Sequence, residues 1–263
     1  MCARIELLGL EVDPLRMDQA VGQVMAWVAD PVRSCHYVVT PNVDHVVLLE
    51  HHTPLREAYS KAGMILVDGM PVYWAAKLLG RPLPARVPGS DLVPALFNAA
   101  RSDAPLRVFL LGAGPGVAQR AASKIEHRWP NVQVVGTYCP PLGFERDEAE
   151  NQRILEKVSA AHADVLVVGL GAPKQELWVH KFHEQIDCPV ALCVGATIDF
   201  LAGEKKRAPV WMRQVGLEWL HRACTEPKRL AKRYLKDAWI FPQLVAKAWW
   251  RSRRQVAVAG GIK

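Results

Sequence analysis

Four short polar segments of this chain have the residue types and positions that catalysis or ligand binding needs. Each follows a run of apolar, mostly β-branched residues that is typical of a buried strand. In a parallel α/β sheet, ligands bind at the carboxyl ends of strands, where helix N-termini and backbone amides face a crevice. If the runs form neighbouring strands, the four segments meet at one edge of the sheet. They are Thr40–Asn42, Asp68–Gly69, Gly169–Glu176 and Gly195–Phe200.

Asp68 is a candidate general base. It follows the apolar run Met64–Val67. A carboxylate at the mouth of a hydrophobic strand can have its pKa raised by burial and can accept a proton from a hydroxyl group. The alternative is an Asx turn in which Gly69 supplies an unusual backbone conformation. Residue type alone favours the turn, and the position after a strand favours the catalytic role.

Gln175 and Asp199 are candidate ligand-binding residues, each with an ordinary structural alternative. Gln175 lies near a predicted helix start, where it could bind phosphate or sugar oxygens, or serve with Glu176 only as a capping residue. Asp199 could accept hydrogen bonds from a ribose or a base, or could cap a short helix. Neither residue alone identifies a ligand.

The glycine-rich segment Gly112–Gly116 resembles a dinucleotide-binding fingerprint but departs from it twice. Val117 stands where the third glycine should be, and the end of the following predicted strand, Gly136–Tyr138, lacks the acid that would hold a ribose hydroxyl. A tight turn that packs a helix on a strand explains the glycines. We still expect the backbone around Gly112 to face the crevice, where it could contact a nucleotide.

Cysteine and histidine do not predict a metal site. The six cysteines contain no Cys-x-x-Cys pair and have no metal-ligand spacing with the nine histidines. His180 and His183 could share one face of a helix, but the sequence suggests no third ligand nearby. We expect reduced, mostly buried thiols, no metal and no cofactor.

The order of elements predicts a Rossmann-like α/β fold, a largely parallel sheet with helices on both faces, because short β-branched runs alternate with amphipathic stretches. With 263 residues, 50% of them hydrophobic, the chain can bury a full core. The predicted strands are Ile5–Leu10, His36–Thr40, Met64–Val67, Arg107–Leu111, Val132–Tyr138, Asp164–Gly169 and Val190–Gly195. The predicted helices between them are Asp18–Val28, Val43–Glu50, Pro71–Leu79, Asp91–Ala100, Gly116–Trp129, Glu148–Ala161 and Lys174–Gln185.

The C-terminal fifth differs from the rest in both charge and pattern. Fourteen of the 33 Lys and Arg residues fall between positions 204 and 254, against four acidic residues, and from Gly216 onward only helices are predicted, Leu217–Thr225 and Pro227–Trp250. We therefore expect an α/β catalytic domain over residues 1–203, a basic helical appendage over residues 204–254, and a tail over residues 255–263.

The basic appendage predicts a partner with negative charge. A basic block beside a near-neutral body is typical of a surface that binds a polyanion or an anionic membrane. Interleaved aromatic residues favour the membrane surface over nucleic acid, since aromatic rings sit well at headgroup depth. The alternative is a solvated basic helix that only keeps the protein soluble. The aromatic residues are Trp211, Trp219, Trp239, Phe241, Trp249 and Trp250.

The start of the chain does not resemble a signal peptide, because Arg4 and Glu6 lie where such a peptide would be apolar. No stretch approaches the roughly 20 apolar residues that span a bilayer. We expect a cytoplasmic protein that associates peripherally with the inner face of the cell membrane.

Taken together, the motifs resemble the WecG/TagA/CpsF glycosyltransferase family. The four polar segments occur in the order seen in that family, and the similarity runs from about Leu8 to Tyr234. Three further motifs belong to the same series, Arg86–Asp91, Arg207–Pro209 and Gly216–Arg222.

The resemblance implies an inverting enzyme that moves a hexosyl unit from a UDP-sugar to a polyprenyl-diphosphate-linked sugar, without the metal-binding Asp-x-Asp signature. This sequence contains no Asp-x-Asp. Asp68 then resembles the base that deprotonates the acceptor hydroxyl. In the same scheme a basic appendage supplies arginines to the diphosphates, and bidentate guanidinium can stabilise the departing UDP. The candidate arginines are Arg222, Arg229 and Arg233.

The resemblance also implies the substrate-binding residues. Thr40, Asn42 and Gln175 resemble residues around the donor diphosphate and sugar, and Asp199 resembles one near the uridine. An aromatic residue of the loop after Val132–Tyr138 would stack on uracil, and this chain offers both Tyr138 and Phe144 around an unusual Cys139–Pro141. Arg86, Gly112 and Lys174 complete the expected set.

The donor sugar is left open by these motifs. UDP-glucose in exopolysaccharide assembly, as in xanthan-type pathways, is the favoured donor, and UDP-N-acetylmannosamine or its uronic acid is the alternative. Two other classes remain as rivals, a nucleotide-binding oxidoreductase and a non-enzymatic membrane scaffold. Self-association into a homo-oligomer is a further expectation from the family.

Overall fold

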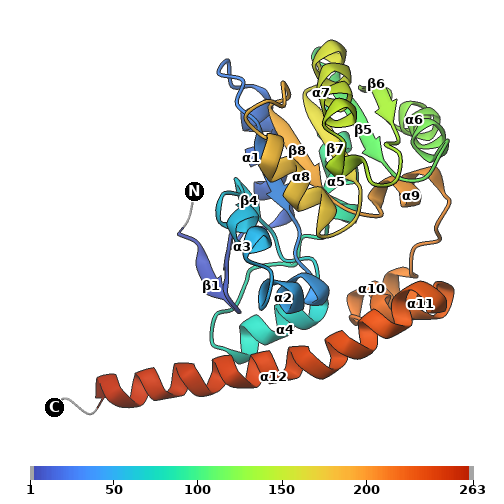
Figure 1. Cartoon of the computed structure of the whole chain (residues 1–263). Coiled ribbons are helices and arrows are strands. Elements are labelled where there is room, and N and C mark those ends of the chain that lie inside the picture. The colour runs from blue at the N-terminus through green and yellow to red at the C-terminus, as the bar shows by residue number, and fades with distance from the viewer. Residues whose placement is uncertain (1–2, 261–263) are drawn as a thin grey trace.

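A six-stranded parallel sheet forms the centre of the molecule. The computed structural model describes residues 3–260, with side chains except at positions 227–229, 231 and 255–260. The strands are β3 (His36–Val39), β4 (Met64–Ile65), β5 (Leu106–Gly112), β6 (Val132–Tyr138), β7 (Val165–Gly169) and β8 (Val190–Cys193). They lie in the order β4-β3-β8-β7-β5-β6, and all neighbouring pairs are parallel (Figure 1). The predicted α/β fold is confirmed.

Helices cover both faces of this sheet, as the sequence predicts. One face carries α1 (Met17–Val28), α5 (Gly89–Asn98), α6 (Val117–Arg128) and α9 (Thr197–Ala202). The other carries α2 (Val43–Leu49), α3 (Thr53–Ser60), α4 (Met70–Leu78), α7 (Glu148–Ala161) and α8 (Lys174–Phe182), together with the short 3-10 turn η1 (Phe144–Arg146).

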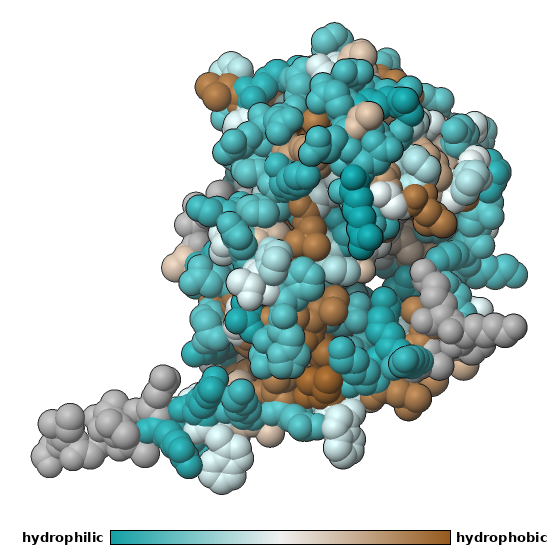
Figure 2. Space-filling model, viewed as in Figure 1, coloured by the Kyte–Doolittle hydropathy of each residue, from teal (hydrophilic) through white to brown (hydrophobic). Residues whose placement is uncertain are grey.

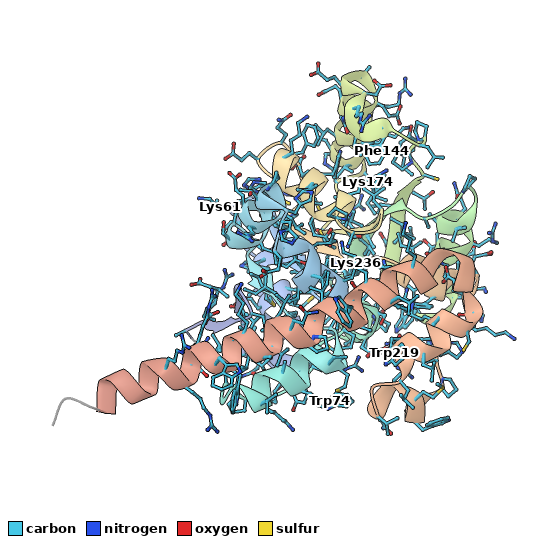
Figure 3. All side chains as sticks on the ribbon, turned by 60° about the horizontal axis from the view of Figure 1, so that its bottom comes forward. Lys61, Trp74, Phe144, Lys174, Trp219 and Lys236 are labelled. Atoms are coloured by element: carbon cyan, nitrogen blue, oxygen red, sulfur yellow. The ribbon has the colours of Figure 1, made fainter. Side chains whose placement is uncertain are left out.

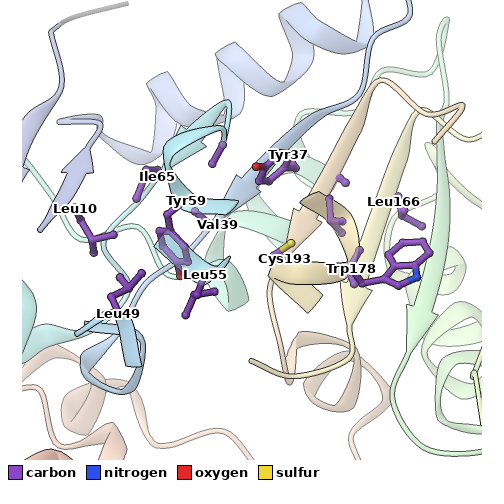
Figure 4. Close-up of a cluster of buried hydrophobic side chains, with 14 of the residues drawn as sticks. Leu10, Tyr37, Val39, Leu49, Leu55, Tyr59, Ile65, Leu166, Trp178 and Cys193 are labelled. Carbon is purple, nitrogen blue, oxygen red and sulfur yellow. The ribbon is translucent and has the colours of Figure 1, made fainter. Parts of the chain in front are cut away.

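Alternate residues of the strands enter two separate hydrophobic cores, because successive side chains of a strand point to opposite faces. In β3, Val38 packs with α1 and α5, whereas Tyr37 and Val39 enter the core with α3 and α8. Figure 4 shows this second core, where strand residues meet Tyr59 of α3 and Trp178 of α8. Burial on both faces explains why the strands are apolar throughout.

The prediction of a single strand over Ile5–Leu10 is wrong. The segment forms an antiparallel hairpin of β1 (Ile5–Leu7) and β2 (Leu10–Val12), which is separate from the main sheet. Leu8 and Gly9 form the turn with φ values of 51° and 80°, as a two-residue hairpin turn requires. Leucine is uncommon at a positive φ, so the sequence carried only half of the usual turn signal.

Three short helices lie in segments for which the sequence predicted no helix. They are α3, α9 and α10 (Val210–Gln214). The α3 helix has Pro54 in its first turn, and the ring nitrogen Nδ1 of His52 accepts a hydrogen bond from the Leu55 N–H at 3.1 Å. Histidine is an unusual cap, which hid the start of this helix.

The C-terminal segment forms two more helices, α11 (Glu218–Thr225) and α12 (Pro227–Gly260), and α12 continues past the predicted end at Trp250. In Figure 1, α12 runs as one long helix along the bottom of the body, and it packs against α2. Phe241, Leu244 and Val245 join the core on that side. Figure 2 shows hydrophobic residues gathered just above α12 on the same face.

Most large apolar side chains that remain exposed lie on α4 or on the C-terminal helices. Among the described residues, Val32 and Leu142 are the exceptions. Figure 3 labels two of the exposed apolar side chains, Trp74 of α4 and Trp219 of α11. Within residues 3–260, no helix combines the length and the apolar character that crossing a bilayer would need. The exposed apolar surface consists of Trp74, Leu78, Val210, Trp211, Val215, Trp219, Leu220, Leu235, Trp239 and Trp250.

Candidate active site

The polar segments singled out in the sequence lie side by side at one edge of the sheet, because β4, β3, β8 and β7 are consecutive neighbours. Two cavities open there, and Ala196 lines both of them. The sheet-edge cavity, about 280 Å³, lies at the ends of β5, β7 and β8 and the loop after β6. The appendage cavity, about 400 Å³, lies between the segments after β3 and β4 and the helices α11 and α12.

Asp68 lies just beyond β4, at the start of α4. Its backbone N–H donates to the carbonyl oxygen of Pro41 at 3.0 Å, which fixes the end of β4 against the end of β3. A Cβ on Gly69 would lie 3.1 Å from the Cα of Asn42, so glycine permits this close approach. The Asp68 carboxylate lines the appendage cavity with 31% of its side chain accessible. A ligand in the cavity can therefore reach it.

The pKa of Asp68 is raised from the ordinary aspartate value to about 6. Burial between the body and the appendage is the main cause, and the carboxylate of Glu218 is the second. The guanidinium groups of Arg86, Arg222 and Arg207 act in the opposite direction. Asp68 is thus ionised at neutral pH and is a stronger proton acceptor than an ordinary aspartate, which suits a general base.

Arg86 lies between two carboxylates. Its Nη1 is 3.9 Å from Asp68 Oδ1 and 3.9 Å from Glu218 Oε2, and it donates to the Asp68 carbonyl oxygen at 3.1 Å. Arg207 sits behind this pair, where its Nη1 lies 2.6 Å from Asp91 Oδ1. The cavity wall therefore carries both charge signs, and Arg86 does not form a close ion pair with the Asp68 carboxylate.

The three arginines expected from the appendage have different surroundings. Arg222 lines the appendage cavity with its guanidinium 5.7 Å from the ring centre of Phe200, and it makes no ion pair with any described residue. Arg233 also lines the cavity but pairs with Asp44 of α2 at 3.3 Å. The side chain of Arg229 lies outside the described residues. Arg222 is thus available for an anionic ligand.

The sheet-edge cavity brings together Phe144, Lys174 and Asp199. Lys174 Nζ lies 5.5 Å from the ring centre of Phe144 and 3.1 Å from Glu145 Oε2. Figure 3 shows Phe144 and Lys174 next to each other. Asp199 enters from α9, and Lys205 lines the same cavity. An aromatic ring, a carboxylate and two ammonium groups suit a base, a ribose and phosphates, respectively.

Tyr138 and Gly112 lie near this cavity without lining it. The Tyr138 hydroxyl donates to Glu150 Oε1 at 2.5 Å, which directs it toward α7. Gly112 has a φ of 110°, and a Cβ there would lie 2.6 Å from the Gly169 carbonyl oxygen, so this glycine serves close strand packing. Its neighbours Ala113 and Gly114 line the cavity instead. Of the two aromatic candidates, Phe144 is the one at the cavity wall.

Thr40 and Gln175 are buried behind the cavities. Thr40 Oγ1 donates to the Cys193 carbonyl oxygen at 3.3 Å, which joins the ends of β3 and β8. Gln175 Oε1 accepts from the Gly195 N–H at 3.2 Å, and its Nε2 donates to Glu176 Oε1 at 2.8 Å. Both residues hold the ligand-facing loops in place, and neither lines a cavity in this conformation.

Asn42 lines the appendage cavity and also begins α2. Its side-chain oxygen accepts from the Asp44 N–H at 3.0 Å, and its own N–H donates to His45 Nδ1 at 3.1 Å. The other ring nitrogen of His45 lies 3.4 Å from the buried carboxylate of Glu176. A buried polar chain therefore connects Asn42 with the first turn of α8.

The appendage cavity is also lined by residues that the sequence did not single out as functional, among them Glu218, Asp44, Asp237 and Phe200. Glu218 stood inside a recognised motif without a role, and Asp44 followed another by two positions. Asp237 is 4% exposed, and its Oδ1 has no hydrogen-bond partner among the described residues. Phe200 lies at the end of a motif, and this position was a sequence signal for it. The cavity lining includes Asn42, Asp44, Asp68, Arg86, Phe200, Arg213, Glu218, Trp219, Arg222, Arg233, Tyr234, Asp237 and Phe241.

Comparisons with known proteins show which family the chain resembles over its length. A family model described as "Glycosyl transferase WecG/TagA/CpsF family" matches residues 5–255. The chain is also similar to two proteins from Staphylococcus aureus, of strains NCTC 8325 / PS 47 and COL, each described as N-acetylglucosaminyldiphosphoundecaprenol N-acetyl-beta-D-mannosaminyltransferase. Each is 30% identical over 246 residues, which cover 94% of this chain and 93% of the relative.

Proposed function

The chain belongs to the glycosyl transferase WecG/TagA/CpsF family, and from that premise we propose that it transfers a hexosyl unit from a UDP-sugar to a polyprenyl-diphosphate-linked sugar with inversion. The carboxylate of Asp68 in a cavity beside a second, phosphate-compatible cavity is the observation that carries this proposal. The relatives' names describe a sugar acceptor on a polyprenyl diphosphate, which supports the same acceptor class here.

The proposed donor is UDP-N-acetylmannosamine. The sequence motifs alone favoured UDP-glucose, but the similar proteins of Staphylococcus aureus are described as N-acetylmannosaminyltransferases. The alternative donor of the sequence analysis therefore replaces the first choice, and the product belongs to a cell-surface glycan.

In the proposed reaction, Asp68 takes the proton of an acceptor hydroxyl. The hydroxyl oxygen forms a bond to the anomeric carbon of the donor, and the bond from that carbon to the UDP β-phosphate oxygen breaks. The bonding electrons leave with UDP, and the proton stays on Asp68 until it passes to solvent. Attack from the side opposite to UDP inverts the anomeric centre. A pKa of about 6 suits the base, because it is ionised at neutral pH and still holds a proton well.

Cationic side chains would balance the charge of the diphosphates. Lys174 and Lys205 line the sheet-edge cavity, where we place UDP with its uracil against Phe144 and its ribose near Asp199. Arg222 lines the appendage cavity, and Ala196 lines both cavities. Guanidinium binds phosphate oxygens through paired hydrogen bonds, and such fixed donors stabilise developing charge on a leaving group.

The acceptor carries a polyprenyl chain, so the protein must meet a membrane. The exposed apolar surface lies on α4 and on the C-terminal helices beside the appendage cavity, and the same helices are rich in Lys and Arg. Aromatic and basic side chains together are typical of a helix that lies in the membrane interface. We propose peripheral attachment to the inner face of the membrane through this surface.

The two rival functions differ from the transferase in what they require. An oxidoreductase would need a dinucleotide site at Gly112–Gly116, where the fingerprint is broken. A scaffold would need only the exposed apolar surface, and the Asp68 carboxylate would have no chemical role in it. Neither rival uses the raised proton affinity of a cavity carboxylate.

The test is product identification. The full-length protein is incubated with UDP-N-acetylmannosamine, UDP-N-acetylmannosaminuronate, UDP-glucose or NAD, together with a short-chain lipid-diphosphate N-acetylglucosamine. We expect a disaccharide product with UDP-N-acetylmannosamine and an increase in melting temperature with UDP but not with NAD. No product from any UDP-sugar, or stabilisation by NAD alone, would reject the proposal.

A further inference from the structure

Glu218 is the acidic residue of the C-terminal helices that lies closest to the catalytic machinery. It is the first residue of α11, and 19% of its side chain is accessible. Its Oε2 lies 3.9 Å from Arg86 Nη1, and its Oε1 lies 3.9 Å from Arg207 Nε. The start of a helix favours an acidic side chain, because the helix dipole is positive at that end. Glu218 is thus held between two of the arginines that surround Asp68.

Asp68 would be a poor base if those arginines acted on it alone. Positive charge close to a carboxylate stabilises the ionised form and weakens its affinity for a proton. Arg86 is equally far from Asp68 and from Glu218, at 3.9 Å each, and makes no side-chain hydrogen bond to either carboxylate among the described residues. The guanidinium of Arg86 therefore interacts with Glu218 as well as with Asp68, instead of with Asp68 alone.

The residue that precedes α11 packs closely on α4, the helix that begins after Asp68. Gly216, just before α11, has a φ of 75°, and a Cβ there would lie 2.8 Å from Met70 Cγ and 2.8 Å from Trp74 Cη2. A side chain at position 216 would push α11 away from α4. The close packing therefore sets the distance between Glu218 and the arginines.

Other charged groups around the cavity are already engaged or lie on its far side. Asp91 holds Arg207 and Arg213 at 2.6 Å and 3.3 Å, and Asp44 holds Arg233 at 3.3 Å. Arg222 faces the cavity and lowers the proton affinity of Asp68, as do Arg86 and Arg207. Asp237 and His45 belong to the α2–α12 side. Glu218 is the acid whose field makes the largest contribution to raising the proton affinity of Asp68, against the effect of the arginines.

We propose that Glu218 is a positioning residue that draws Arg86 and Arg207 away from Asp68 and so keeps the Asp68 carboxylate free to take the acceptor proton. The inference rests on the proposed transferase function, in which Asp68 is the base. Because Glu218 belongs to the appendage, the base reaches full strength only when Gly216, two residues before Glu218, is packed on α4. The appendage then supplies a carboxylate for the chemistry in addition to its cations.

The test compares Glu218→Gln, which removes the charge and keeps the shape, with Glu6→Gln as a matched control. Glu6 also pairs with an arginine, Arg81, but on the surface of the N-terminal hairpin. The dependence of kcat/KM on pH is measured for the lipid-linked acceptor. In Glu218→Gln we expect the pH below which kcat/KM falls to decrease by about one unit. The kcat measured where it no longer depends on pH should fall about three- to tenfold, and the KM for the donor should be unchanged. Glu218→Asp should restore part of both effects.

A titration without substrates separates this inference from the proposed function. The Asp68 carboxyl is followed by carbon-13 NMR in the full-length parent and in each variant, and its assignment is checked with Asp68→Asn. A lower titration midpoint in Glu218→Gln supports the inference even if no UDP-sugar reacts. The inference is overturned if the titration midpoint of Asp68 is unchanged in Glu218→Gln. It is also overturned if kcat falls but the pH below which kcat/KM decreases stays the same. If Glu218→Gln does not fold, an unmoved midpoint in Glu218→Asp overturns it equally.

Discussion

Arg233 of α12 pairs with Asp44 of α2 at 3.3 Å, two residues from Asn42 at the end of β3. The pair ties the basic appendage to the helix that begins at the cavity wall. Next to it, Asp237 has a carboxylate oxygen without a hydrogen-bond partner among the described residues. The docking surface of α12 is therefore also a wall of the cavity in which Asp68 lies.

Replacing Asp237 by Asn should strengthen the docking of α12 at neutral pH. Burial raises the pKa of Asp237 to about 6, Asp44 adds to the increase, and Arg233, Lys236 and His45 oppose it. An acidic group whose pKa is raised in the folded state does not destabilise the fold at a pH below its ordinary pKa near 4. At higher pH its destabilising free energy grows, until the pH passes about 6. Each pKa unit corresponds to about 1.4 kcal/mol, so removing the charge should stabilise the docked helix by about 1–3 kcal/mol.

Hydrogen exchange of the α12 amides measures this effect. At pH 7.5 the amides of Asp237→Asn should exchange more slowly than those of the parent protein, and the difference should shrink toward pH 4. Faster exchange in the variant at pH 7.5 would mean that the ionised carboxylate stabilises α12.

Replacing Arg222 by Ala should lower turnover far more than stability. Arg222 faces the cavity without an ion pair among the described residues, so little in the fold depends on its charge. Loss of one fixed donor to a leaving group typically costs about 10²–10³ in kcat. Arg101→Ala, which removes a surface arginine paired with Asp103, is the control. Parent-like kcat in Arg222→Ala, measured with saturating donor, would contradict this role.

The rate should fall at acidic pH through protonation of Asp68. Because the pKa of Asp68 is raised to about 6, the base is ionised above this pH and protonated below it. The kcat/KM for the acceptor should be level above about pH 7 and should drop about tenfold per pH unit well below 6. If kcat/KM instead began to fall only near pH 4, the proton acceptor would be a carboxylate more exposed than Asp68.

Activity should persist when divalent metals are removed. The sequence has no Asp-x-Asp, and the proposed phosphate partners are the cationic side chains of Lys174, Lys205 and Arg222. Turnover in excess EDTA should remain within about twofold of the untreated rate, because side-chain donors can stabilise the departing diphosphate themselves. Loss of activity in EDTA that added Mg²⁺ restores would show that a metal ion carries that charge.

Much of the fold was predictable because it depends on local patterns. Strands such as Val165–Gly169 are apolar throughout, and Asp68 follows one of them, so both the sheet and a carboxylate at its edge follow from neighbouring residues in the sequence. The hairpin turn at Leu8–Gly9 was missed because leucine rarely adopts a positive φ.

The contacts between distant segments were not predictable. Glu218 lies near Arg86 in a structure where Gly216 packs on α4, and the spacing of these residues in the sequence does not predict that contact. Phe144 and Tyr138 were equal aromatic candidates in the sequence, and the hydrogen bond from Tyr138 to Glu150 that separates them depends on how α7 packs. Charge alone also did not distinguish Arg222, which is unpaired among described residues, from Arg233, which binds Asp44.

The most direct measurement is the rate of sugar transfer by Asp68→Asn, with UDP affinity measured on the same preparation. Asn keeps the size of the side chain and cannot take a proton, so kcat should fall by about 10²–10⁴. UDP should bind as tightly as to the parent protein, because the proposed nucleotide residues line the other cavity. Parent-like transfer by Asp68→Asn would contradict the role of Asp68 as the base.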